Sequence, residues 1–279
     1  MTVDMKSLEA ELGPGPMRFA PSSDERTLEQ QLASLTAQEK ECVDTLKSKW
    51  EAAHPDLPFS DAMYLRFARC SPGQKKFNVK ASWKVMKAFD HRYLSLTAET
   101  LENQLLSQTL FPVPGLRSNE GHSVFYMYPA RYFPAKTSTQ DIIDNLAYCM
   151  NCMCETSEKD SSEGIAFLAY MNDWKMANFS VNYCYQFMMM LQGRIPVRVR
   201  MFLIVNPPSW FSKIWAIMKP MLAPDFRKKV HVIPEAKLSQ FLEQGYESYL
   251  PSEMAHGKAD VEELVQDFVT YRKHVECAE

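Results

Sequence analysis

The feature that most constrains the fold is an alternation of strand-like and helix-like segments after about residue 100. Four short runs are rich in aromatic or β-branched residues, as buried strands are, and they cover residues 122–128, 164–171, 199–205 and 229–233. Helical patterns follow these runs in turn, at residues 139–154, 179–192, 209–219 and 235–244, with another at 260–274. This alternation is typical of a mainly parallel sheet covered by helices, so we predict an α/β fold.

The part of the chain before residue 100 has a different pattern. Residues 25–50 carry apolar side chains at steps of three and four, and further helical patterns cover residues 61–70 and 79–93. Three helices joined by short breaks predict a small helical bundle over residues 25–100, followed by the sheet domain over 101–279. Residues 1–24, which are rich in glycine and proline, are expected to form a flexible arm.

The composition excludes several classes of protein. Of 279 residues, 46% are hydrophobic and 23% charged, which is ordinary for a globular chain. The net charge of −3 argues against a nucleic-acid binder. No apolar run approaches the roughly 18 residues that cross a bilayer, and the acidic start lacks the pattern of a signal peptide. We therefore expect a cytoplasmic protein, whose odd number of seven cysteines fits reduced thiols.

Motifs for catalysis are missing from the sequence. It has no G-x-S-x-G elbow, P-loop, dinucleotide fingerprint or H-E-x-x-H, and its six histidines are scattered. Cys149, Cys152 and Cys154 form a C-x-x-C-x-C pattern that could hold zinc or exchange thiols. No second ligand pair follows, and a helix capped by Ser138 would bury them as small apolar residues. We expect no metal, no cofactor and no enzyme; an enzyme that uses these cysteines is the weakest alternative.

The segment NPPSWFSKIWAIMKPML, residues 206–222, is unusually rich in tryptophan and other apolar residues. On a helical wheel its apolar side chains fall within an arc of roughly 160°, wider than a surface helix needs. Two interpretations stay open. The helix is either a well-buried part of an α/β core, or a lid that covers an apolar cavity and enters a membrane interface when it opens. Tryptophan and lysine together are typical of interfacial helices.

Two groups of basic residues stand out on this net-acidic chain. They comprise Arg66, Arg69, Lys75 and Lys76 in the predicted bundle, and Arg227, Lys228 and Lys229 after the Trp-rich segment. Such groups are usually solvated surface, but each cation near an anionic membrane contributes about 1 kcal/mol of attraction. We predict that these residues bind an anionic membrane or a phosphoinositide transiently.

Several stretches together resemble the CRAL-TRIO family of lipid-transfer proteins, which includes tocopherol-, retinaldehyde- and phosphatidylinositol-binding members. The bundle motifs YLRFARC and KKFNVKASWKVMKAFDHRY resemble the family's leading helices. The block RVRMFLIVNPPSWFSKIWAIMKPMLAPDFRKKVHVI resembles its strongest signature, a strand ending before a gate helix. The closing QGYESYLPSEMAHGK resembles a further motif but lacks its double glycine. The similarity covers about residues 25 to 270.

The resemblance implies a CRAL-TRIO-type sheet with one lipid in a closed apolar pocket beneath the gate helix, without covalent chemistry. By position, the pocket wall would come from Ile165, Phe167, Ala169, Phe179, Phe187, Met190, Leu191, Ile195, Val197 and Phe202. The gate would contribute Phe211, Ile214, Trp215 and Met218. Plain core packing is the alternative role for each of these residues.

The resemblance also bears on the ligand. Phosphatidylinositol-binding relatives hold the headgroup with an arginine, a glutamate and a lysine, whose positions correspond to Ser71, Val197 and Lys229 here. Only the lysine matches, although Lys75 or Lys76 could replace the arginine. We therefore expect a cytoplasmic carrier, peripheral at membranes, for a small hydrophobic ligand such as a tocopherol or retinoid. The alternatives are a phosphatidylinositol or phospholipid transfer or sensing protein, and a protein-interaction or membrane-recruitment module with a vestigial pocket.

Overall fold

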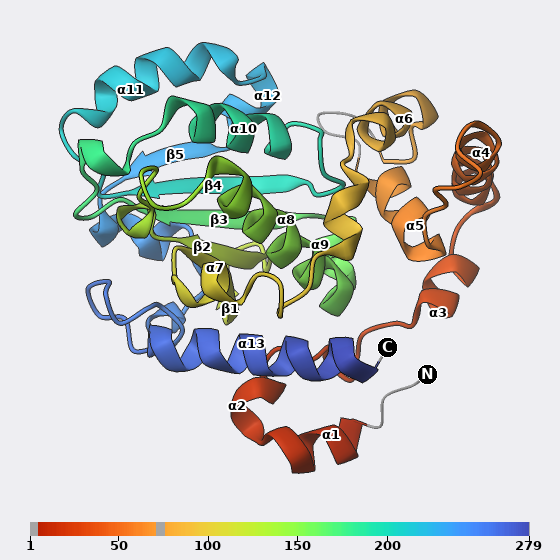
Figure 1. Ribbon diagram of the computed structural model, residues 1–279, viewed down its shortest axis with the longest axis horizontal. Helices are drawn as coiled ribbons and strands as arrows, with labels where there is room; N and C mark the ends of the chain where they lie inside the picture. Colours follow the sequence, from red (N-terminus) through yellow and green to blue (C-terminus); the bar gives the residue numbers. More distant parts are fainter. Residues whose placement is uncertain (1–4, 71–75, 279) are drawn as a thin grey trace.

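A single mixed sheet forms the centre of the protein. The computed structural model describes residues 5–70 and 76–278, and within them five strands are ordered β1-β2-β3-β4-β5 (Figure 1). The strands are β1 Leu110–Arg117, β2 Ser123–Met127, β3 Ile165–Tyr170, β4 Val199–Val205 and β5 Val230–Ile233. Strands β2 to β5 are parallel, and β1 pairs antiparallel with β2. The predicted α/β fold with a mainly parallel sheet is confirmed.

Strand β1 is the strand that the sequence pattern missed. It contains Pro112 and Pro114, and its register against β2 shifts between Pro112 and Arg117. Proline lacks an amide hydrogen and is tolerated in sheets mainly at an edge. The two prolines hide the strand pattern in the sequence and also explain why this strand lies at the edge.

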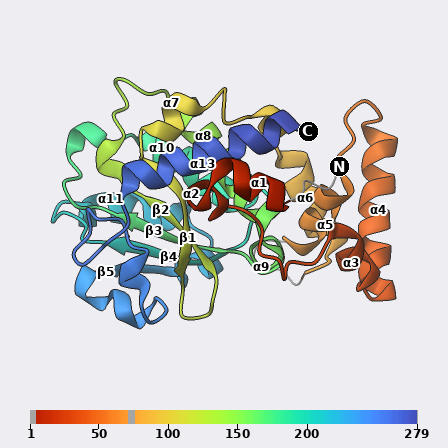
Figure 2. The same ribbon diagram turned by 90° about the horizontal axis from the view of Figure 1, so that it is seen from below.

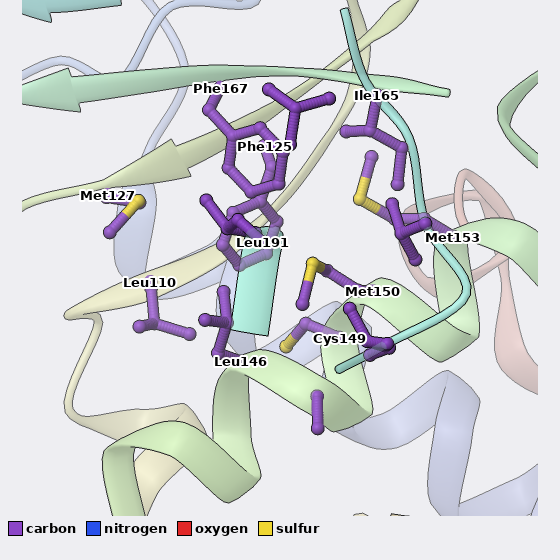
Figure 3. Close-up of a cluster of buried hydrophobic side chains, with 14 of the residues drawn as sticks. Leu110, Phe125, Met127, Leu146, Cys149, Met150, Met153, Ile165, Phe167 and Leu191 are labelled. Carbon is purple, nitrogen blue, oxygen red and sulfur yellow. The ribbon is translucent and has the colours of Figure 1, made fainter. Parts of the chain in front are cut away.

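The helices that connect the parallel strands lie on one face of the sheet (Figure 1). Because the strands follow one another in order, right-handed crossovers bring every connection to the same side. These connections contain α8 Thr139–Thr156, α9 Glu158–Ser162, α10 Val181–Leu191, α11 Phe211–Met218 and α12 Pro224–Arg227. Figure 3 shows Phe125 and Phe167 from the sheet packed with Leu146 and Met150 of α8 and Leu191 of α10.

Short 3-10 turns complete this part of the chain. They are η1 His91–Ser95, η2 Pro129–Arg131, η3 Met176–Asn178, η4 Lys219–Met221, η5 Glu235–Gln240 and η6 Tyr246–Ser248. The helix expected over residues 235–244 is therefore the short turn η5. No helix within residues 5–70 and 76–278 has both the length and the apolar character needed to span a bilayer.

The N-terminal helices form a group beside the sheet (Figure 1). They are α3 Leu28–Ala33, α4 Ala37–Ala53, α5 Asp61–Arg69 and α6 Val79–Ala88, with α7 Glu102–Leu106 leading into the sheet. The single helix expected over residues 25–50 is two helices, because Thr36 starts α4 with a capping box in which its side chain accepts from the amide of Glu39. The helix expected over 79–93 ends at Ala88 and is followed by η1.

The N-terminal segment differs from the flexible arm expected over residues 1–24. Residues Met5–Leu12 form α1 and Pro14–Met17 form α2, and both helices lie along the C-terminal helix α13 Val261–Ala278 (Figure 2). Phe19 is buried against Phe268 of α13, with ring centroids 5.1 Å apart. Proline is favoured in the first turn of a helix, so its presence here starts α2. The apolar face of α13 then gives the segment a surface to pack on.

Candidate functional site

A small apolar cavity lies at the carboxyl ends of β2, β3 and β4, beneath α10 and α11. Its volume is about 70 Å³. The sheet contributes Met127, Ala169, Phe202 and Ile204, and the helices contribute Tyr183, Cys184, Phe187, Met188, Phe211 and Met218. The carboxyl edge of parallel strands is the usual place for a ligand site in α/β folds.

Helix α11 covers the cavity with one face and meets solvent with the other. Phe211 and Ile214 are 6% and 8% exposed, whereas Ile217 is 60% exposed. Trp215 is half-buried, and its ring lies 6.0 Å from that of Phe211. The expected wide apolar arc is therefore divided between a buried face and an exposed face.

The start of α11 is set by Asn206, at the end of β4. Asn206 has a positive φ of 50°, which asparagine tolerates better than most residues. Its side chain both accepts from the amide of Glu235 (2.9 Å) and donates to the Glu235 carboxylate (3.0 Å). These two hydrogen bonds hold the sharp turn, after which Pro207 and Pro208 lead the chain away from the sheet and into α11.

Methionine side chains make up a large part of the cavity wall. Met127, Met171, Met188 and Met218 come from four different segments. Methionine is unbranched and flexible, so it can fill a contracted cavity and move aside for a ligand. The wall is therefore adaptable.

Five of the fourteen predicted pocket residues line this cavity, namely Ala169, Phe187, Phe202, Phe211 and Met218. Ile165, Phe167 and Leu191 do not line the cavity and pack in the hydrophobic core near Met150 and Met153 of α8 (Figure 3). Met190, Ile195, Val197 and Ile214 are buried outside the cavity wall, and Phe179 and Trp215 are half-buried. A ligand role for these nine residues stays a prediction.

Several lining residues were missed by the sequence analysis. They are Met127, Pro129, Met171, Trp174, Asn178, Tyr183, Cys184, Met188 and Ile204. The position of Met127 and Ile204 near the ends of predicted strands could have identified them. Trp174 and Asn178 lie in the connection between β3 and α10, where no periodic pattern assigns a direction to a side chain.

The predicted membrane contacts in the bundle need correction. Arg66 and Arg69 are only 4% and 5% exposed. Arg66 donates to Asn151 (3.0 Å), and Arg69 donates to Gln31 (2.8 Å) and pairs with Glu158 (3.5 Å). They join the bundle to the sheet domain and are not available to a flat membrane. Lys75 lies outside the described residues.

The other predicted basic residues lie near the amino ends of β4 and β5. Lys229 donates to the carbonyl of Val199 (2.6 Å), and burial together with the positive charges of Arg198 and Arg200 lowers its pKa. Burial also lowers the pKa of Lys76, with smaller contributions from Arg198 and Arg69 that the charge of Glu163 opposes. Concentrated positive charge of this kind favours binding of an anion.

Arg227 and Lys228, which precede Lys229, differ in their contacts and in their exposure. Arg227 donates to the carbonyl of Leu222 (2.7 Å), which holds the end of the α11 segment. Lys228 has a mostly exposed side chain, 3.3 Å from Asp225. Lys228 is thus the more accessible of the two to a membrane or anion.

The three clustered cysteines are buried in α8. Cys149 lies within the core shown in Figure 3, and Cys152 and Cys154 are buried too. Burial raises the pKa of Cys149 and Cys152, and it raises the pKa of Cys154 to about 12. Because the thiolate is the reactive and metal-binding form, these positions suit packing better than thiol chemistry. The described residues contain no group of three or more His, Cys, Asp or Glu side chains that could hold a metal ion.

The chain is similar to known proteins both in sequence and in structure. The chain is 24% identical to tyrosine-protein phosphatase non-receptor type 9 of Mus musculus and of Homo sapiens, in each case over 144 residues. These matches cover 52% of this chain but only 24% of each relative. Among solved structures, the crystal structure of Sfh5 aligns with a TM-score of 0.48 at 13% identity, covering 87% of this chain and 98% of that chain.

A family model accounts for the region that contains the sheet and the cavity. Residues 107–255 match the model of the CRAL/TRIO domain. This range includes all five strands, α10 and α11, and it is more than half of the chain. The protein therefore belongs to the CRAL/TRIO domain family, which supports lipid binding or transfer in general.

Proposed function

We propose that the protein carries a small hydrophobic ligand, such as a tocopherol or a retinoid, and transfers it between membranes through movement of α11. The observation that carries this proposal is the apolar cavity beneath α11, at the carboxyl ends of the central strands. Family membership supports a lipid as the ligand. The resemblance assigns Val197 to the position of a headgroup-binding glutamate in phosphatidylinositol-binding members, and a valine there favours an apolar ligand over a charged headgroup.

The cavity is too small for the proposed ligand unless α11 moves. One water molecule needs about 10–15 Å³, so a cavity of about 70 Å³ holds a few waters and no retinoid. Loading requires α11 and the flexible methionines to move outward. Pro207 and Pro208 at one end of α11, and Pro220 at the other, bound the segment that would move.

Energetics favour release at a membrane over release into water. Burying some 400 to 500 Å² of apolar ligand surface yields on the order of 10 kcal/mol before the costs of binding. Escape into water is then slow. At a membrane, lipid solvates both the departing ligand and the exposed face of α11, which lowers the cost of opening.

The experiment that tests the proposal is mass spectrometry of lipid that co-purifies with the protein, combined with titration of added retinaldehyde and tocopherol. We expect one saturable site for a small hydrophobic ligand. Recovery of phospholipid alone, together with no binding of either added ligand, would refute the proposal.

We further propose that the chain acts without catalysis. The match covers only a quarter of the relatives' length, so their phosphatase name is no evidence of phosphatase activity in this chain. A cysteine nucleophile needs a lowered pKa, whereas burial raises the pKa of Cys42, Cys70 and the three cysteines of α8. Absence of turnover of a general phosphatase substrate by the purified chain is the expected result.

A second candidate function is transfer or sensing of phosphatidylinositol or another phospholipid. The specific observation that favours it is the basic cluster of Lys76, Arg198, Arg200 and Lys229 near the amino ends of β4 and β5. A phosphorylated headgroup would offset the mutual repulsion that contributes to the lowered pKa values of the two lysines. The effect of removing Lys229 on phospholipid loading separates this function from the first.

A further inference from the structure

Trp174, a residue that lines the apolar cavity, carries a buried hydrogen-bond donor. Its side chain lines the cavity and is 7% exposed. Within the described part of the chain, its buried Nε1 has no hydrogen-bond partner. Indole is a donor only, and a buried donor without an acceptor costs about 1–3 kcal/mol. Most buried polar groups in native proteins have partners, so this N–H points to an acceptor supplied from elsewhere.

The surroundings of Trp174 hold its ring in place but supply no strong acceptor. The ring stacks on Trp210, with centroids 4.5 Å apart, and meets Phe179 and Phe211 edge to face. Aromatic ring faces accept hydrogen bonds only weakly, so these contacts do not replace an oxygen. The indole is therefore fixed in position while its N–H lacks a good partner.

Asn178, four residues further on in the same connection, shows the contrast. Its Nδ2 donates to the carbonyls of Ala130 and Tyr132, both at 2.9 Å, and its Oδ1 accepts from the amide of Lys175 at 2.9 Å. Asn178 uses its polar atoms to hold the connection itself. Trp174 also lines the cavity, but its Nε1 has no hydrogen-bond partner among the described residues.

We infer that Trp174 Nε1 donates a hydrogen bond to an acceptor oxygen at one end of the bound ligand. This inference rests on the proposed carrier function and narrows its ligand class. The preferred ligand is a hydrocarbon skeleton with a terminal carbonyl or hydroxyl oxygen, as in a retinoid or tocopherol, and not a pure hydrocarbon. The oxygen lies at the Trp174 end, beneath the start of α11, and the hydrocarbon lies among the methionines.

The test compares two probes in three proteins. The probes are all-trans-retinaldehyde and its deoxygenated analogue, which has the same polyene without the carbonyl oxygen. The proteins are the unsubstituted chain, Trp174→Phe and the control Trp210→Phe. Trp210 belongs to the same stack but does not line the cavity, so its substitution alters the aromatic packing and leaves the Trp174 N–H in place.

Loss of one hydrogen bond should raise the Kd for retinaldehyde, relative to that for the hydrocarbon, by roughly 3- to 10-fold in Trp174→Phe. The same ratio should stay unchanged in Trp210→Phe. An equal change for both probes in Trp174→Phe, or no change for either, would overturn the inference while leaving the carrier function intact. If neither probe binds the unsubstituted chain, the carrier function in its retinoid form fails and the inference fails with it.

A second measurement covers the case in which Trp174→Phe does not fold. In the unsubstituted protein, a carbonyl buried without a donor would make retinaldehyde the weaker ligand by roughly tenfold or more. A ratio of the two Kd values near one supports the hydrogen bond. A preference of that size for the hydrocarbon contradicts it.

Discussion

Ala169 is a small side chain in the cavity wall, and it offers a direct way to fill the space. The change Ala169→Leu adds three heavy atoms to a cavity of about 70 Å³. We expect the affinity for a retinoid or tocopherol to fall at least about tenfold, with a loss of stability of roughly 1–3 kcal/mol from overpacking. Fluorescence titration and thermal unfolding measure the two effects. Ala216→Leu, on the exposed face of α11, is the control and should change neither.

The same variant bears on the alternative of an interaction module with a vestigial pocket. Unchanged ligand affinity in Ala169→Leu would place the ligand outside this cavity. Loss of ligand binding without any effect on cellular function would favour the interaction module over the carrier.

Substitution of Lys229 distinguishes a phospholipid ligand from a small hydrophobic ligand. Its pKa is lowered by burial and by Arg198 and Arg200, so it lies within a concentrated positive field. If the protein loads phosphatidylinositol, Lys229→Ala should abolish loading, whereas Lys228→Ala, a change at its exposed neighbour, should have little effect. The carrier proposal instead expects retinoid binding to be equal in both variants. Loading of radiolabelled phosphatidylinositol from vesicles is the measurement, and equal loading by the two variants would count against the phospholipid function.

Among the helices, α11 has an outer face whose substitution should affect ligand transfer to membranes without affecting ligand binding. Ile217 is 60% exposed on its outer face, away from the cavity wall. We expect Ile217→Ser to slow ligand transfer to vesicles several-fold, because it removes an apolar contact with the membrane interior, and to leave the equilibrium Kd unchanged. Val232→Ser is the matched control, since Val232 is an exposed apolar residue on β5. Slower transfer in both variants, or a changed Kd in Ile217→Ser, would contradict a membrane-facing role for α11.

The N-terminal helices allow a separate test of packing. Phe19 is buried against Phe268 of α13, so Phe19→Ala should lower the free energy of unfolding by about 3 kcal/mol. Arg18 pairs with Glu263 and Asp267 but is partly exposed, so Arg18→Ala should cost less than about 1 kcal/mol. Urea denaturation measures both values. Equal and negligible effects would mean that the segment contributes no packing energy.

The elements predicted from sequence are those with strong local patterns. Strands β2 to β5 are short runs of branched and aromatic residues, and their alternation with helices fixed the parallel topology. Strand β1 was missed because Pro112 and Pro114 disguise it. Helices α1 and α2 were missed because their stability comes from contact with α13, more than 240 residues away in sequence. A cavity lies beneath the helix that the sequence analysis expected to act as a gate, but the positions of residues in irregular connections, such as Trp174, depend on tertiary packing that no local pattern encodes.

At the scale of the whole molecule, two features lie at opposite ends of the parallel strands. The apolar cavity and the start of α11 are at the carboxyl ends, whereas Arg198, Lys229 and the exposed Lys228 are near the amino ends of β4 and β5. Seven residues of β4 span roughly 20 Å between these ends. A membrane that meets the protein at one end of the strands leaves the other end about that far from its interface, so the orientation of docking decides which residues matter.

The carrier proposal requires docking through α11, which carries the exposed Lys213 one turn before Ile217 and is followed directly by the exposed Lys219. Neutralising both lysines, in Lys213→Gln with Lys219→Gln, should weaken binding to anionic vesicles by roughly 10- to 30-fold, at about 1 kcal/mol for each cation. The residual binding should be less sensitive to salt, because screening acts only on the charges that remain. Vesicle co-sedimentation at two salt concentrations measures both effects. If Lys228→Gln weakens binding more than the double change at Lys213 and Lys219, the protein docks mainly through the amino ends of the strands, and docking through the outer face of α11 is contradicted.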